Sequence, residues 1–254
     1  MPTNRQHIVI VGATSAIAEH CARIWVADAP VTLDLIGRDP AKLDAVAADL
    51  RVRSPQSEIR THLVSSAYFT DPAAITALVD RITADHAPDI VLIAHGSLPD
   101  QAACQSDLAA MRDALITNAM SPALFAEAFA AHLLRAGRGT LALIGSVAGD
   151  RGRKSNYVYG AAKGLVARYA QGLQHRFAGS AVKVVLIKPG PTATPMTAQL
   201  AQRGARLASV EAVARAMVAG IAKGKPVIYA PAPWRLIMLV IRHLPAFLFN
   251  RMNI

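Results

Sequence analysis

Short runs of β-branched residues alternate with longer amphipathic stretches along the whole chain, and this alternation most constrains its fold. The expected strands cover residues 7–11, 31–36, 59–64, 90–94, 140–144, 182–187 and 227–229. The expected helices cover residues 15–27, 41–51, 72–84, 107–136, 156–177 and 210–222. Repeated strand–helix units require parallel strands joined by right-handed crossovers. The sequence therefore predicts an α/β fold with a single, doubly wound parallel sheet and helices on both faces.

The composition fits one domain over residues 1–254. Of the 254 residues, 53% are hydrophobic and 17% are charged, which supplies a large core and argues against a disordered chain. No leader-like segment opens the chain, and no apolar run of about 20 residues occurs in it. Cys21 and Cys104 are expected to be buried thiols in a reducing compartment. We therefore expect a cytoplasmic protein.

The formal net charge of +10 limits the kinds of partner that the chain can have. A basic protein suits an anionic cofactor, an anionic substrate or an anionic membrane surface. No platform of alternating aromatic and basic residues occurs, so no nucleic acid is expected. The histidines and cysteines lack spacings such as His-x-x-x-His or Cys-x-x-Cys, so no metal is expected either.

A turn of small residues follows the first expected strand, where Gly12 begins Gly12-Ala13-Thr14-Ser15. In a Rossmann-type fold such a turn lets backbone N–H groups and the helix dipole face a dinucleotide diphosphate. Ala16 and Ala18 stand where further glycines would allow the closest approach, so a plain small-residue turn remains an alternative. The candidate cofactor contacts in this turn are Gly12, Thr14, Ser15 and Ile17.

The second expected strand ends at Gly37, and Arg38 follows it. A carboxylate at this position would bind the ribose diol of NAD, whereas a guanidinium pairs with the 2′-phosphate of NADP. Arg38 therefore favours NADP(H), with NAD(H) as the alternative. Asp39 is expected to cap the next helix.

Three residues have the spacing of a proton-transfer site. Tyr159 and Lys163 are four residues apart in an expected helix and so share one face. Ser146 lies thirteen residues before Tyr159, just after the strand-like run 139–145. An ammonium beside a phenol lowers the phenol pKa, and a hydroxyl aimed at the same place can hold a substrate oxygen. These residues predict hydride-transfer chemistry.

Together these segments resemble the short-chain dehydrogenase/reductase family over nearly the whole chain. The Tyr-x-x-x-Lys pair, Ser146, and Asn118 in Ile116-Thr117-Asn118-Ala119 match its catalytic residues. The resemblance implies that Asn118 supports a water relay behind Lys163. It also implies cofactor contacts from Ala94, His95, Gly96, Tyr159, Lys163, Pro189, Thr192 and Thr194.

The resemblance implies an NAD(P)H-dependent carbonyl reductase. A hydride would pass from the nicotinamide to a ketone carbon, while Tyr159 gives a proton to the oxygen. Ser146 would bond that oxygen, and Lys163 would hold the ribose and lower the Tyr159 pKa. The alternatives are a cytosolic reductase of small ketones or 3-ketoacyl thioesters, and a non-catalytic dinucleotide-binding sensor or scaffold.

A narrower resemblance, to the reductase partner of the decaprenylphosphoryl-ribose epimerase pair, rests on a basic run after Ser146 and on the apolar, basic tail. It implies a 2-keto sugar on a polyprenyl phosphate as the substrate and a flavin-dependent oxidase as a partner. Residues 190–208 are expected to form the substrate loop. The candidate substrate contacts are Arg151, Arg153, Lys154 and Asn156, with a solvated basic loop as the alternative.

The segment 232–254 is apolar and basic, with six consecutive apolar residues from Leu236 to Ile241 between Arg235 and Arg242. One interpretation is a helix buried against the core or an oligomer partner. The other is an interfacial segment at the inner face of the membrane. The small residues within 109–135 and 156–177 also predict a homo-oligomer that packs through these helices.

Overall fold

The computed structural model describes residues 5–65 and 69–252 and contains a seven-stranded sheet in the order β3-β2-β1-β4-β5-β6-β7. Every neighbouring pair of strands is parallel. The strands are β1 Gln6–Val11, β2 Val31–Gly37, β3 Glu58–Leu63, β4 Ile90–Ile93, β5 Thr140–Ile144, β6 Lys183–Pro189 and β7 Val227–Ala230. The predicted doubly wound α/β fold is confirmed.

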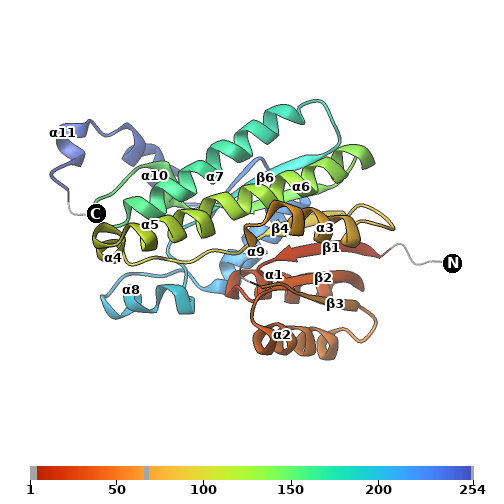
Figure 1. Cartoon of the computed structure of the whole chain (residues 1–254). Coiled ribbons are helices and arrows are strands. Elements are labelled where there is room, and N and C mark those ends of the chain that lie inside the picture. The colour runs from red at the N-terminus through yellow and green to blue at the C-terminus, as the bar shows by residue number, and fades with distance from the viewer. Residues whose placement is uncertain (1–4, 66–68, 253–254) are drawn as a thin grey trace.

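Helices cover both faces of the sheet (Figure 1). The helices from the first half of the chain are α1 Ala16–Asp28, α2 Pro40–Arg53, α3 Pro72–Ile82, α4 Gln101–Ser106, α5 Leu108–Leu115 and α6 Ser121–Ala136. Those from the second half are α7 Tyr157–Arg176, α8 Ala198–Gln202, α9 Val210–Ala222, α10 Trp234–His243 and α11 Ala246–Phe249. Asp39 and Asp71 cap α2 and α3, accepting hydrogen bonds from the N–H groups of Lys42 at 3.2 Å and Ala73 at 3.0 Å.

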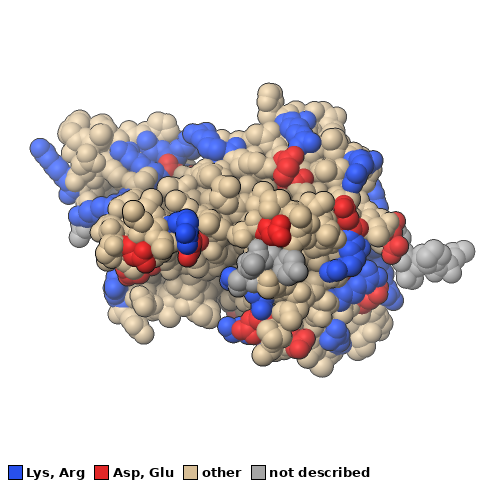
Figure 2. Space-filling view, in the orientation of Figure 1, with Lys and Arg blue, Asp and Glu red and all other residues tan. Residues whose placement is uncertain are grey.

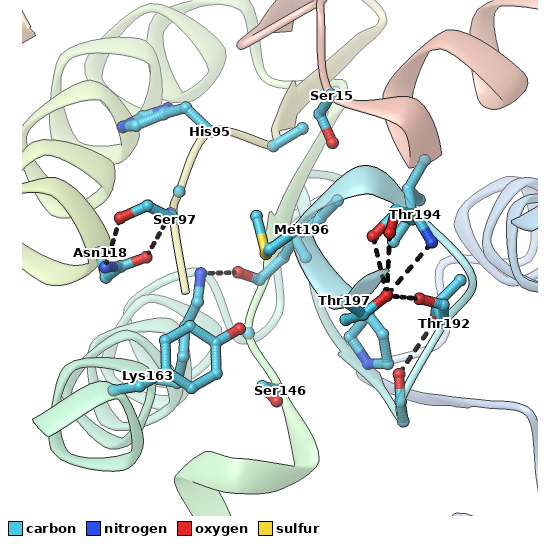
Figure 3. Close-up of a pocket in the computed structure, with 18 residues that line it drawn as sticks. Ser15, His95, Ser97, Asn118, Ser146, Lys163, Thr192, Thr194, Met196 and Thr197 are labelled. Atoms are coloured by element: carbon cyan, nitrogen blue, oxygen red, sulfur yellow. Dashed lines mark hydrogen bonds between the residues drawn. The ribbon is translucent and has the colours of Figure 1, made fainter. Parts of the chain in front are cut away.

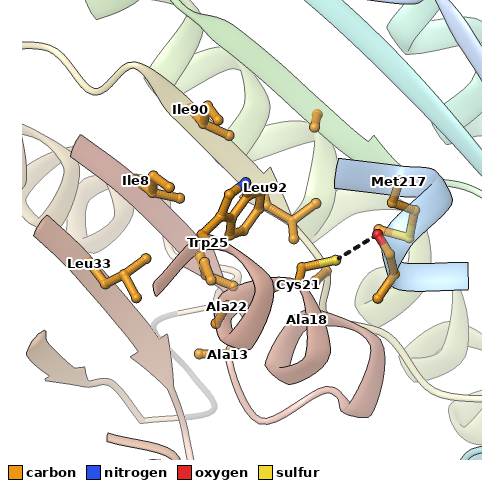
Figure 4. Close-up of a cluster of buried hydrophobic side chains, with 14 of the residues drawn as sticks. Ile8, Ala13, Ala18, Cys21, Ala22, Trp25, Leu33, Ile90, Leu92 and Met217 are labelled. Atoms are coloured by element: carbon orange, nitrogen blue, oxygen red, sulfur yellow. Dashed lines mark hydrogen bonds between the residues drawn. The ribbon is translucent and has the colours of Figure 1, made fainter. Parts of the chain in front are cut away.

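One hydrophobic core lies on each face of the sheet. The side chains of α1, α2 and α9 pack on one face, and those of α3, α6 and α7 pack on the other. Figure 4 shows Trp25 of α1 beside the strand residues Ile8 and Leu92 in the first core. Burial there raises the pKa of Cys21 to about 12, so this thiol is inert. Cys21 and Cys104 are both buried and unpaired, as predicted.

The reversal of strand order places a crevice at one edge of the sheet. β1 pairs with β2 on one side and with β4 on the other, so the chain turns in opposite directions after β1 and β4. In open parallel sheets, ligands bind outside the carboxyl ends of the strands at this point. The residues that follow β1 and β4 therefore meet at a ready binding site.

The helical region expected over 107–136 is present: it consists of α5, a π-helical turn at Ile116–Met120 and α6, and α4 precedes it. The expectation of a plain loop over residues 190–208 is corrected, because this segment contains a 3₁₀ turn at Pro195–Thr197 and the short helix α8. Helices as short as α8 give too little periodicity to separate from a loop.

The span Leu108–Ala136 is long and apolar enough to cross a membrane by length and composition. Half of its most apolar window is buried, however, and Phe125, Phe129 and Leu133 fill the core under the sheet. Its apolar face therefore has a partner within the fold.

Candidate active site

Two adjoining pockets lie at the β1–β4 crevice. The outer cleft has a volume of ≈ 550 Å³ and runs from the first turn to Arg38, while the inner chamber is smaller, at ≈ 90 Å³. Both contain Ser15, Ile17, His95 and Gly96 in their walls. The two pockets therefore share part of their walls and form one site, with a larger outer part and a smaller inner part.

The structure brings all four candidate catalytic residues to the inner chamber: Ser146, Tyr159, Lys163 and Asn118. Figure 3 shows Ser146, Lys163 and Asn118 arranged around it, with Met196 between them and Ser15. It also brings every candidate cofactor contact to the wall of one pocket or the other: Gly12, Thr14, Ser15, Ile17, Arg38, Ala94, His95, Gly96, Tyr159, Lys163, Pro189, Thr192 and Thr194.

Close backbone packing fixes α7 against the segment after β5. A Cβ atom on Gly149 would lie 2.6 Å from the carbonyl carbon of Lys163, and one on Gly160 would lie 2.9 Å from the carbonyl oxygen of Ala148. Such distances are too short for any side chain, so only glycine allows the two segments to meet. This contact places Tyr159 and Lys163 beside Ser146.

Tyr159 is half-buried in the wall of the inner chamber, and the loss of water around its phenol is the largest influence on its acidity. Burial raises the pKa of Tyr159, and a hydrogen bond with Ser146 opposes that rise. The expectation of a more acidic phenol is therefore wrong, and the ammonium nitrogen of Lys163 lies 5.9 Å from the ring centroid. The phenol keeps its proton at neutral pH, and this is the form that can donate one.

Lys163 is almost fully buried at the end of the chamber. Its Nζ donates a hydrogen bond to the carbonyl oxygen of Ile144 at 2.9 Å. Burial lowers the pKa of Lys163 to about 8, because the charged form is less stable away from water. The side chain is therefore mostly charged at neutral pH and becomes neutral in mildly alkaline solution.

We expect kcat/KM for proton-coupled chemistry at this site to fall above about pH 8, by about tenfold per pH unit, as Lys163 loses its proton. The sign follows from the lowered pKa, because the ammonium is present below this value and lost above it. A pH–rate profile with saturating cofactor measures the effect. A profile that stays level to pH values well above 8 would contradict it. The Lys163→Met variant should be slow at every pH and lack this decline.

Asn118 lies in the π-helical turn and holds the segment after β4. Its Oδ1 accepts a hydrogen bond from the N–H of Ser97 at 2.9 Å, and its Nδ2 donates to the carbonyl oxygen of Ala114 at 2.9 Å. A Cβ on Gly96 would lie 2.9 Å from that Oδ1 and 3.5 Å from Lys163 Nζ. Irregular turns of this kind are frequent at functional sites, because they turn a helical side chain out of register.

The first turn meets the segment after β4 in a backbone contact. Gly12 has φ +85°, and a Cβ there would lie 2.6 Å from the backbone nitrogen of His95. Ser15 stands at the N-cap of α1, but its hydroxyl makes no capping hydrogen bond. The hydroxyl and the helix N-terminus thus remain available to an anionic ligand.

His95 stands between the two pockets as a neutral side chain. Burial lowers the pKa of His95 to about 3, with the charges of Lys163 and Arg38 acting in the same direction. One ring nitrogen, Nε2, lies 2.9 Å from Ser121 Oγ, while the other, Nδ1, is buried without a hydrogen-bond partner. Within residues 5–65 and 69–252, no group of three or more His, Cys, Asp or Glu side chains could hold a metal ion.

Charged side chains line the far end of the outer cleft. Arg38 is exposed there, with its guanidinium carbon 5.5 Å from the ring centroid of Phe69. Lys42, one turn into α2, lines the same end and lies 3.2 Å from Asp39. Because Arg38 and Lys42 together outweigh the single carboxylate of Asp39, this end of the cleft suits an anion.

The loop after β6 borders both pockets. Thr197 Oγ1 donates to the carbonyl oxygen of Thr192 and accepts from the N–H of Thr194 at 3.2 Å. At its far end the loop pairs back, with Ala193 N–H donating to Ala208 O at 2.8 Å. Met196, between these fixed points, lies in the wall of both pockets.

The candidate substrate contacts are placed elsewhere, because the walls of the two pockets include none of Arg151, Arg153, Lys154 and Asn156. Arg151 instead binds the C-terminal segment: its Nη1 donates to the carbonyl oxygens of Ile241 and Leu244, at 2.6 Å each. Arg153 has a buried Nε without a partner, and burial lowers the pKa of its guanidinium. The basic run of the sequence does not reveal that Arg151 contacts α10, which lies far along the chain.

Sequence reasoning missed several residues of the pocket walls, among them Lys42, Phe69, Ser97, Gly190, Met196 and Thr197. Lys42 could have been found, since it follows Arg38 by four residues at the start of a helix. Phe69 reaches the cleft through folding alone, and its own segment has no recognisable pattern.

The comparisons with known proteins identify the family. The model of the short chain dehydrogenase family matches residues 6–204. An uncharacterized oxidoreductase of Mycobacterium tuberculosis is 32% identical over 251 residues, with 98% of each chain covered, and another from Streptomyces coelicolor is 31% identical over 250 residues, covering 96% of this chain and 95% of the relative. This chain belongs to the short-chain dehydrogenase/reductase family, whose members are NAD(P)-dependent oxidoreductases.

Solved structures agree on the fold. A short-chain dehydrogenase from Sphingobium yanoikuyae, solved in complex with NADPH, superposes with a TM-score of 0.80. Its sequence is 23% identical, and the match covers 98% of this chain and 96% of that one.

Proposed function

We propose that this oxidoreductase is an NADPH-dependent carbonyl reductase. One observation carries the proposal: the inner chamber, which contains a proton donor, adjoins the outer cleft, which has basic side chains at its far end. The chamber holds Ser146, Tyr159 and Lys163, and the cleft ends at Arg38. The cleft suits a dinucleotide, because the turn residues Gly12 and Ser15 line it at the N-terminus of α1 and Arg38 offers a guanidinium to a phosphate.

The residues of the chamber would work on a ketone oxygen. A bound dihydronicotinamide supplies the hydride. Tyr159 donates its phenolic proton to the oxygen as negative charge develops there, and Ser146 donates a hydrogen bond to the same atom. Lys163 would hold the nicotinamide ribose, and a proton from water, relayed past Asn118 and Lys163, would restore the phenol. The raised pKa of the resting phenol suits reduction, which needs a proton donor.

Replacement of Arg38 by Ala tests the cofactor preference. Loss of a charge-assisted contact to the 2′-phosphate should weaken NADPH binding about 10- to 100-fold and leave NADH binding nearly unchanged. Titration of both cofactors by fluorescence measures this difference. Arg112→Ala removes another exposed arginine, one that is absent from the walls of both pockets, and it should change neither affinity. An equal loss for both cofactors upon Arg38→Ala would contradict the assignment.

The substrate class is open to a direct assay. Oxidation of NADPH is followed with small ketones, with 3-ketoacyl thioesters and with a 2-keto sugar on a polyprenyl phosphate, which would come from a flavin-dependent oxidase. Activity with any of these ketones supports the reductase. Tight NADPH binding without turnover on all of them would instead favour a dinucleotide-binding sensor.

We further propose that the protein is a cytoplasmic homo-oligomer. Leu108, Met120 and Leu165 are exposed on the long helices α5–α7 and would be covered by packing between copies. Sedimentation of the purified chain measures this state.

A further inference from the structure

The C-terminal segment, Trp234–Met252, exposes most of its apolar side chains. Met238 is the buried residue of α10, while Leu236 is 68% exposed and Val240 62% exposed. On α11, Phe247 is 64% exposed. Exposed neighbours extend this apolar surface, which consists of Leu236, Ile237, Leu239, Val240, Phe247 and Leu248. A gathering of exposed apolar side chains in one segment is typical of a site of interaction.

All charged side chains of the C-terminal segment are basic. No Asp or Glu follows Glu211 in the sequence, whereas Arg235, Arg242 and Arg251 border the surface. Figure 2 shows Lys and Arg gathered at the end of the molecule where α10 and α11 lie in Figure 1. The partner of this surface must therefore offer both apolar material and negative charge.

The segment is fixed to the body of the protein. The guanidinium carbon of Arg151 lies 3.8 Å from the ring centroid of Phe249, while its Nη1 binds the carbonyl oxygens at the end of α10. At the other end the Trp234 ring lies so close to Gly190 that a Cβ there would be 2.0 Å from its Nε1. The apolar surface is thus held outward by the fold.

The same contacts place the surface beside the candidate active site. Gly190 lines the inner chamber, and Arg151 follows the 3₁₀ turn that begins after Ser146. Asp150 in that turn pairs with Lys188 and accepts a hydrogen bond from Tyr229 at 2.8 Å, which ties the turn to β6 and β7. A partner on the segment would therefore sit next to the chamber.

We propose that the C-terminal segment docks on an anionic lipid bilayer. Its apolar side chains would enter the boundary between headgroups and acyl chains, with the bordering arginines on lipid phosphates. A second copy of the chain fits less well, because a symmetric contact would bring the arginines of both copies together with no carboxylate in the segment to pair them. The proposal does not depend on the reductase activity, since binding is measured without turnover.

The experiment is co-sedimentation of the full chain with vesicles. Phosphatidylcholine vesicles are compared with vesicles containing about one third phosphatidylglycerol, and we expect at least about tenfold stronger binding to the anionic ones, weakened by salt. The variant Leu236→Ser/Val240→Ser/Phe247→Ser and the variant Arg235→Glu/Arg251→Glu should each lose at least about tenfold in affinity. Thermal melting and NADPH binding report whether the variants remain folded.

Two matched controls separate docking from general effects. Val52→Ser/Leu63→Ser removes apolar side chains that are 82% and 58% exposed elsewhere, and Arg60→Glu/Arg112→Glu makes the same change in net charge away from the segment. Both should bind like the wild-type chain. Absence of wild-type binding to anionic vesicles, or equal binding by the triple-serine variant, overturns the proposal. So does an oligomer that the triple-serine variant dissociates while the wild-type chain ignores vesicles, because the surface would then join copies of the chain.

Discussion

Tyr159→Phe should reduce turnover by about 10²- to 10⁴-fold, the range expected when a general acid is removed. The change deletes one oxygen from a half-buried ring in the chamber wall, so the chamber keeps its shape and α7 keeps its packing. The affinity for NADPH should therefore change little. Steady-state kinetics with an accepted ketone, together with a fluorescence titration of the cofactor, measure the two quantities separately.

Tyr157→Phe is the matched control, because it makes the same change two residues earlier on α7, at a side chain that is 43% exposed. It should leave turnover within about twofold of the wild-type value, as surface changes usually do. Near-normal turnover in Tyr159→Phe would remove this residue from the mechanism. A loss of NADPH binding in the same variant would show that the residue acts on the cofactor.

Gly12→Ala should nearly abolish dinucleotide binding. An alanine at φ +85° carries strain of about 1–2 kcal/mol, and its Cβ would also overlap the backbone of His95. Backbone cannot move aside as a flexible side chain can, so the turn and the segment after β4 must separate. Because both lie in the pocket walls, we expect an affinity loss of at least about 100-fold, together with a lower melting temperature.

Gly137→Ala separates strain from overlap. Gly137 has φ +67°, but a Cβ there would meet nothing within 4 Å, so this variant carries the conformational cost alone. It should be destabilised by about 1–2 kcal/mol and bind NADPH normally. If Gly12→Ala behaved like Gly137→Ala in both measurements, the close contact between the first turn and His95 would not matter for the cofactor.

The sequence predicted the parts of this protein that depend on local pattern. Strand and helix periods gave the sheet, and the four-residue spacing of Tyr159 and Lys163 placed both in the inner chamber. Ser146 and Arg38 were predicted because each lies within two residues of the end of a strand, and the carboxyl ends of parallel strands meet at one edge.

Features made by distant segments could not be predicted. Asp34 on β2 is buried between His7 of β1 and His62 of β3, at 2.6 Å from each, and no spacing within one strand reveals this pairing. Arg151 was predicted to contact the substrate because basic residues lie next to it in the sequence. In the folded chain its guanidinium binds α10 instead. The acidity of Tyr159 likewise depends on burial, which outweighs the helix neighbour considered from spacing alone.

The most direct test of hydride transfer at this site uses NADPH with deuterium at the transferable C4 position and an accepted ketone, in a single turnover with enzyme in excess. The account predicts deuterium on the new carbinol carbon with the wild-type enzyme, and about 10²- to 10⁴-fold slower transfer with Tyr159→Phe. Bound cofactor that gives no deuterium to any ketone, or transfer at an equal rate in both proteins, would contradict it.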